Sequence, residues 1–298
     1  MIFNTYHLGC AEWVRDNVYA AYVHLRAAKF MVDSSGGLEA LDQPFAELLV
    51  LGDGFVAAEL QKKPLFSHQE LQRVDEEPVE EYGLYYLRKL LTGSVPAGAG
   101  FLLSSQHSIV PPSLRSIVMD LAVGVSIMNS YFQTRMDQVA PVAVVHWVFR
   151  RTLINRHCLL NLEFEELRSE ALRLALIMWT LRTTGAGRKR TSRSMAPYLR
   201  EILVIISQAF WNGHEEIKAW ILTIGAISAA PNSNENKWFI RELSSQFFYG
   251  IRDSTIVLQG LLARAGRFLM LEATERETLE DLSHVIVAAS TSPRGGKW

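Results

Sequence analysis

Apolar residues recur three or four positions apart along most of this chain, and this spacing limits its fold more than any other feature. From Glu12 to Val32 apolar side chains return once per helical turn, and the pair Gly36 and Gly37 then supplies a stop signal. No segment shows the alternation of a half-buried strand, and no heptad repeat is sustained. The sequence therefore predicts an all-α fold, a single large bundle of about ten packed antiparallel helices over residues 1–298.

The same spacing places the individual helices and the irregular segments between them. Residues 92–112 are rich in glycine and proline, which predicts an irregular segment, and residues 183–194 are expected to form a basic loop. The expected helices are Glu12–Val32, Phe45–Leu60, Pro78–Leu91, Pro112–Phe132, Pro141–His157, Glu163–Arg182, Met195–Trp211, His214–Ser228, Glu235–Tyr249, Ser254–Arg267 and Glu275–Ala289.

Composition and charge exclude several classes of protein. With 49% hydrophobic residues the chain can bury a large core, whereas a net charge of -1 lacks the positive field that supplies most nucleic-acid affinity. No apolar run reaches the ~20 residues that a membrane-spanning helix needs. Only two cysteines are present and no export signal is apparent, so we expect a reducing intracellular environment.

Motifs for cofactors and metals are missing. The chain has no nucleophile elbow, no zinc-protease helix, no phosphate-binding Walker loop and no dinucleotide fingerprint, so we expect no cofactor and no metal site. The basic run Arg188–Arg193 is interpreted as a solvated, mobile loop, with a nuclear-import signal or an anion site as the alternative.

Tryptophans beside arginines suggest a ligand pocket. Trp147 and Trp179 fall on two expected helices, with Arg150 and Arg182 one turn or less from them. Convergent aromatic rings with a few polar groups are typical of a site for an apolar ligand, and each arginine would hold a carboxylate or carbonyl. Ordinary core packing explains the same rings without any ligand.

Asp53 is a further candidate for a ligand-binding residue. It lies between two glycines in the middle of the apolar helix Phe45–Leu60, where an acidic side chain is costly. A buried hydrogen bond or a kink at the surface would also account for it.

Four segments together resemble a known family. Residues 24–38 fit the pattern H-L-x-x-x-x-x-M-V-x-x-x-G-G-L, and the others are Pro44–Asp53 with Lys63–Phe66, Arg173–Leu181, and Ala219–Ile227 with Trp238 and Phe239. In this order they resemble the helical regulatory domain of fungal zinc binuclear-cluster transcription factors. The DNA-binding finger of that family needs six closely spaced cysteines, and this sequence contains none of that cluster.

The resemblance implies a regulatory domain that receives signals from a hydrophobic small molecule or a protein partner, homodimers included, in the nucleus. This chain alone is expected to bind neither DNA nor a membrane. Two alternatives stay open, both compatible with a cytoplasmic location. One is a metal-independent cyclase or isomerase that orients a hydrophobic metabolite, and the other is an interaction scaffold. Three explanations for the missing DNA-binding finger stay open: the sequence is a fragment, a truncated gene product or a natural standalone protein.

Overall fold

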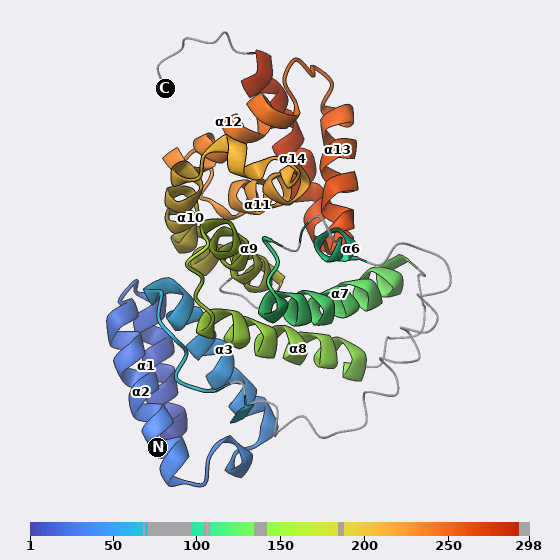
Figure 1. Cartoon of the computed structure of the whole chain (residues 1–298). Coiled ribbons are helices and arrows are strands. Elements are labelled where there is room, and N and C mark those ends of the chain that lie inside the picture. The colour runs from blue at the N-terminus through green and yellow to red at the C-terminus, as the bar shows by residue number, and fades with distance from the viewer. Residues whose placement is uncertain are drawn as a thin grey trace.

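The structure is a computed structural model that describes residues 1–67, 69–70, 97–103, 106, 108–133, 142–183 and 188–291. Its described residues form helices and connecting turns without a strand, which confirms the all-α prediction (Figure 1). The helices are α1 (Ile2–Val14), α2 (Val18–Ser34), α3 (Gln43–Leu60), α6 (Ala99–Leu102), α7 (Pro112–Gln133), α8 (Val142–Asn161), α9 (Leu167–Thr183), α10 (Arg188–Ile205), α11 (Glu215–Ser228), α12 (Asn234–Phe247), α13 (Ser254–Arg267) and α14 (Glu272–Thr291), with 3₁₀ turns η1 (Leu38–Ala40) and η3 (Gln208–Trp211).

Helix α9 is the centre of the arrangement. Residues 171–181 of α9 are all buried, as expected for a helix that is apolar all round. Helices α8, α10 and α11 pack against it, and α11 continues the contacts to α12 and α13. In Figure 1 the hairpin of α1 and α2 lies at one end with α3, and α12, α13 and α14 lie at the other.

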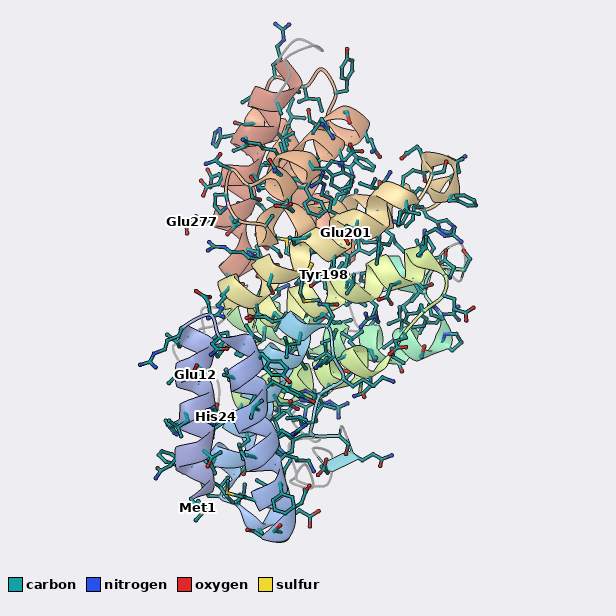
Figure 2. The ribbon with its side chains drawn as sticks, turned by 90° about the vertical axis from the view of Figure 1, so that its left-hand side faces the viewer. Met1, Glu12, His24, Tyr198, Glu201 and Glu277 are labelled. Carbon is teal, nitrogen blue, oxygen red and sulfur yellow. The ribbon has the colours of Figure 1, made fainter. Side chains whose placement is uncertain are left out.

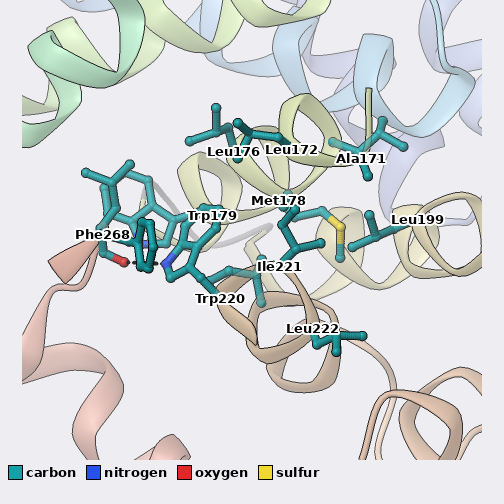
Figure 3. Packing of buried hydrophobic residues seen from close by; sticks show 14 of the residues in the cluster. Ala171, Leu172, Leu176, Met178, Trp179, Leu199, Trp220, Ile221, Leu222 and Phe268 are labelled. Atoms are coloured by element: carbon teal, nitrogen blue, oxygen red, sulfur yellow. Dashed lines mark hydrogen bonds between the residues drawn. The ribbon is translucent and has the colours of Figure 1, made fainter. Parts of the chain in front are cut away.

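Two hydrophobic clusters stabilise this arrangement. The larger one surrounds α9 and contains Trp179, Trp220 and Phe268, whose rings gather beside Leu176 (Figure 3). The indole of Trp220 donates a hydrogen bond to the carbonyl of Leu269 at 3.1 Å, so its polar atom is satisfied inside the core. The smaller cluster joins α1, α2 and α3 around residues such as Leu25 and Leu49.

The single helix predicted from Glu12 to Val32 is wrong. Helix α1 already begins at Ile2 and ends at Val14, and α2 starts at Val18. The chain reverses between them because Asp16 adopts a left-handed φ of 64° and the Asn17 side chain accepts a hydrogen bond from the amide of Ala20. This local capping outweighs a continuous apolar pattern.

The predicted basic loop at residues 183–194 is also wrong beyond residue 187, because α10 begins at Arg188. Arg190 packs 4.6 Å over the ring of Trp13 and donates a hydrogen bond to the Trp13 carbonyl. Its Nε also lies 3.5 Å from Glu59. These contacts dock the basic run on the N-terminal helices in place of a mobile loop, while residues 184–187 lie outside the described residues.

Two further predicted segments differ in part from the observed structure. The helix expected from Met195 to Trp211 is replaced by the last turns of α10 and by η3. The irregular segment 92–112 contains the short helix α6 and a turn at residues 108–110, and its residues 92–96, 104, 105 and 107 lie outside the described residues, as does the helix predicted over 78–91.

One face of the molecule brings α1, α2, α10 and α14 into a single view (Figure 2). Acidic side chains stand on three of these helices, at Glu12, Glu201 and Glu277. The expectation that this chain does not bind nucleic acid stays a prediction. Across the described part of the chain, no helix has both the length and the low polarity to span a membrane.

Candidate functional site

A groove of about 490 Å³ opens between α10, η3, α11 and α12. The aliphatic ends of Leu203, Val204 and Ile206 form one wall, at the place where α10 ends. The other lining residues are Gln208, Lys218, Trp238, Glu242 and Gln246. The groove therefore combines four apolar residues with four polar or charged ones. Apolar walls beside a few hydrogen-bonding groups can hold a small molecule.

Helix α12 contributes a stripe of three side chains to the groove. Trp238, Glu242 and Gln246 are four residues apart, so they lie along one helical face. The Gln246 amide donates to a Glu242 oxygen at 2.6 Å, and this bond orients both side chains. Among the described residues, Oε1 of Gln246 is buried without a hydrogen-bond partner. A buried acceptor of this kind is costly unless a donor reaches it.

Lys218 stands on α11 on the opposite side of the groove. The residue is only 6% exposed, its ammonium donates a hydrogen bond to Gln208, and the charge lies 5.7 Å from the centre of the Trp211 ring. Burial lowers the pKa of Lys218 below its ordinary value, and the charge of Glu242 opposes that shift. The chain thus keeps a largely desolvated amine at the groove, which costs stability.

These groups define the chemistry of the groove. Lys218 can donate to a carboxylate or carbonyl, and Oε1 of Gln246 can accept from a hydroxyl or amide. The ring of Trp238 and the aliphatic wall suit the apolar body of the same molecule. An amphipathic organic acid or carbonyl compound matches this arrangement.

Replacing Lys218 with methionine should stabilise the protein and raise its melting temperature by about 2 to 4 °C, since the burial cost of the ammonium disappears. Because the pKa of Lys218 is lowered in the folded chain, burying its ammonium destabilises the fold fully at pH values below the folded-state pKa. This destabilisation fades as the pH rises toward the pKa of lysine in the unfolded chain, about 10.4. The gain should therefore shrink at alkaline pH in scanning calorimetry. The exposed Lys237 on α12 provides the matched control, Lys237→Met, for which no shift is expected. A lower melting temperature for Lys218→Met would contradict the burial argument.

The predicted ligand-binding residues on α8 do not line this groove. Trp147 is half-buried and lies 5.8 Å from the guanidinium of Arg151. Arg150 faces inward, with a side chain 11% exposed, and its Nε lies 3.3 Å from a Glu47 oxygen. An internal carboxylate thus already occupies the position proposed for a ligand carboxylate.

The corresponding pair on α9 lies in the core. Trp179 is 2% exposed and belongs to the cluster around α9. Arg182 donates to the carbonyl of Ile227 at 2.6 Å, and its Nε lies 3.9 Å from Glu275. Burial raises the pKa of the Glu275 carboxyl, and the nearby Arg182 charge partly offsets this. A pocket shared by Trp147 and Trp179 stays a prediction.

Asp53 has a structural environment. It is 1% exposed, and its two oxygens accept hydrogen bonds from the backbone amides of Leu65 and Phe66, each at 3.0 Å. Its Oδ2 also lies 3.5 Å from Nε2 of His157, which is completely buried. The carboxylate thereby ties the chain after α3 to α3 itself and to α8.

The residues of the groove were not predicted from the sequence, although a signal for them exists. Lys218 directly precedes the apolar run of α11, and Trp238, Glu242 and Gln246 repeat at a spacing of four. That spacing predicts a shared face but not the partner across from it. Only the packing of α12 against α10 and α11 brings Lys218 opposite this stripe.

Comparisons with protein-family models, curated proteins and solved structures found no match to this chain. The all-α class is therefore defined by the structure, and the resemblance to a fungal regulatory domain rests on the sequence segments alone. Within the described ranges, no cluster of three or more histidine, cysteine or acidic residues could hold a metal ion.

Proposed function

We propose that this chain is a ligand-sensing regulatory domain that binds an amphipathic organic acid in the groove between α10, α11 and α12. The observation that supports this most is Lys218, a buried amine that lines the groove together with Trp238. Natural proteins retain such a costly group chiefly where it serves a function. The proposal agrees with the sequence resemblance, which implies a domain that receives small-molecule signals.

The position of the groove suits a regulatory role. Three helices and η3 meet there, so a bound molecule would contact α10, α11 and α12 at once. Helix α10 also contacts α3 through Thr191, whose hydroxyl donates to Glu59 at 2.9 Å. A ligand that binds only the folded arrangement stabilises it by mass action, and α10 links the groove to the N-terminal helices.

The test uses 8-anilinonaphthalene-1-sulfonate, a fluorescent probe with an apolar ring system and one anionic group. We expect saturable binding, a higher melting temperature and quenching of tryptophan fluorescence that is reduced in Trp238→Phe. Lys218→Met should weaken probe binding about tenfold, the equivalent of one charge-assisted hydrogen bond.

Lys237→Met is the matched control, because it removes a lysine from the exposed side of α12. If Lys218→Met and Lys237→Met bind the probe as the unaltered chain does, the groove is not an anion site and the proposal fails. If Lys218→Met does weaken probe binding, competition by a panel of apolar carboxylic acids identifies the ligand class.

A further inference from the structure

A hydroxyl, an imidazole and an amide lie in a row where Gln106 and the turn at residues 108–110 meet the start of α11. The Ser108 hydroxyl oxygen lies 3.3 Å from Nε2 of His214. Nδ1 of the same ring lies 2.7 Å from Oε1 of Gln106. His214 follows Ser108 by 106 positions and Gln106 by 108 positions, so only the fold brings the imidazole to these two side chains.

The hydrogen bonds define the tautomer of His214. The Gln106 amide nitrogen donates to the carbonyl of Gly213 at 3.4 Å, which turns its Oε1 toward the imidazole. Since that oxygen can only accept, Nδ1 of His214 must supply the hydrogen. Nε2 then keeps its lone pair and accepts from the Ser108 hydroxyl, which is the arrangement of a nucleophile with its general base.

Hydrogen bonds hold Gln106 and residues 109 and 110 in place, while the Ser108 hydroxyl stays accessible. Gln106 is 5% exposed, and its carbonyl accepts hydrogen bonds from the amides of Ile109 and Val110 at 3.1 and 2.9 Å. The Ser169 hydroxyl donates to the carbonyl of Ile109 at 2.9 Å. Ser108 itself is exposed to solvent. A fixed backbone with an exposed hydroxyl is the form in which a nucleophilic serine can meet a substrate.

The surroundings favour a neutral imidazole. Partial burial lowers the pKa of His214, and the guanidinium of Arg168 lowers it further, whereas Glu215 and Glu166 act in the opposite direction. His214 also directly precedes α11, so the positive end of that helix dipole lies beside it. An unprotonated ring near neutral pH is what a general base requires.

We infer that Ser108 and His214 form an acyl-transfer site that hydrolyses small carboxylic esters, with Gln106 as the positioning residue. The Ser108 oxygen bonds to the ester carbonyl carbon while His214 takes its proton, and the C–O bond to the alcohol then breaks as that alcohol receives the proton. Water next attacks the acyl carbon, His214 takes a proton from it, and the Ser108 oxygen leaves and regains a proton. The product is a carboxylic acid.

Exposed apolar side chains close in sequence to His214 and Gln106 suggest the preferred acyl group. Phe210, four residues before His214, is 63% exposed, and Leu103, whose carbonyl accepts from the Gln106 amide, is 45% exposed. Esters with a short apolar acyl chain fit these neighbours. This site is separate from the side chains that line the groove, so the two proposals stand or fall independently.

The first test treats the full chain with a fluorophosphonate probe, in which the serine oxygen displaces fluoride from phosphorus, and with p-nitrophenyl acetate. We expect one labelled serine, identified as Ser108 by peptide mapping, and ester hydrolysis above the rate in buffer. Ser108→Ala should abolish both. Ser116→Ala removes another exposed serine whose hydroxyl donates to the Ser113 carbonyl, and it should change neither. Absence of labelling, or labelling that persists in Ser108→Ala, would overturn the inference.

The second test examines the positioning role. His214→Gln should slow labelling and hydrolysis by at least about 100-fold, the usual contribution of a general base. Gln106→Leu should also slow them, whereas Gln106→Glu should restore the rate because a carboxylate accepts from the same ring nitrogen. The added charge raises the pKa of His214, so the acidic limb of the pH–rate profile should move to higher pH. Equal pH profiles for Gln106→Glu and the unaltered chain would show that Gln106 has no such role.

Discussion

Replacing Asp53 with alanine is expected to lower the free energy of unfolding by about 3 to 5 kcal/mol. The substitution removes the acceptors of two backbone amides, the buried amide of Phe66 and the partly buried amide of Leu65. Each buried donor left without an acceptor costs about 1 to 3 kcal/mol. His157 would lose its neighbouring carboxylate in addition. Urea unfolding followed by circular dichroism measures the change.

Two related variants make the Asp53 prediction specific. Asp53→Asn preserves the shape and one acceptor oxygen, so it should cost about half as much as Asp53→Ala. Asp33→Ala removes an acidic residue that pairs with Lys29 at 2.6 Å on the surface of α2, and such a pair contributes only about 0.2 to 0.5 kcal/mol. Equal midpoints for Asp53→Ala and Asp33→Ala would refute the structural role assigned to Asp53.

Gly225→Ala should lower the free energy of unfolding by about 2 to 3 kcal/mol, although alanine is the better helix former. A methyl group at this position of α11 would overlap the ring of Phe239 on α12 at three of its carbon atoms. Phe239 is fully buried, so its ring cannot move aside, and overpacking of this kind forces a backbone shift. Thermal unfolding of the two chains provides the measurement.

Gly266 on α13 is the matched control for Gly225, because a methyl group there meets no atom within 4 Å. Gly266→Ala should stabilise the protein by about 0.5 to 1 kcal/mol through the reduced entropy of the unfolded chain. Combining Gly225→Ala with Phe239→Leu should cost less than the sum of the separate changes, since the smaller side chain relieves the overlap. Strict additivity would speak against a direct clash.

Predictions from local pattern succeeded where a helix is bounded by its own residues. The expected helix Ser254–Arg267 has the observed limits, because the signal at its start is local: Asp253 caps the helix and accepts a hydrogen bond from the Thr255 amide. These predictions failed where a contact with a distant part of the chain determines the local structure. The basic run after residue 187 became a helix because Arg190 finds Trp13, and no window of sequence contains both.

The candidate site shows the same division. An acidic residue in an apolar helix signalled that Asp53 is unusual, and the structure assigns it a hydrogen-bonding role that the sequence left as one of two explanations. The groove around Lys218 and the row from Ser108 to Gln106 were not predicted. Both depend on side chains from separate elements, and periodicity reports only the face of a single element.

The sequence by itself determined that this protein is all-α, because the spacing of apolar residues and the helix caps act within a few positions along the chain. The tertiary structure alone decided which polar groups meet. Lys218 and Trp238 line one groove, and the Ser108 hydroxyl lies 3.3 Å from His214, because helix packing brings separate segments of the chain together. These contacts between side chains depend on the burial of whole helical faces, which local propensity does not encode.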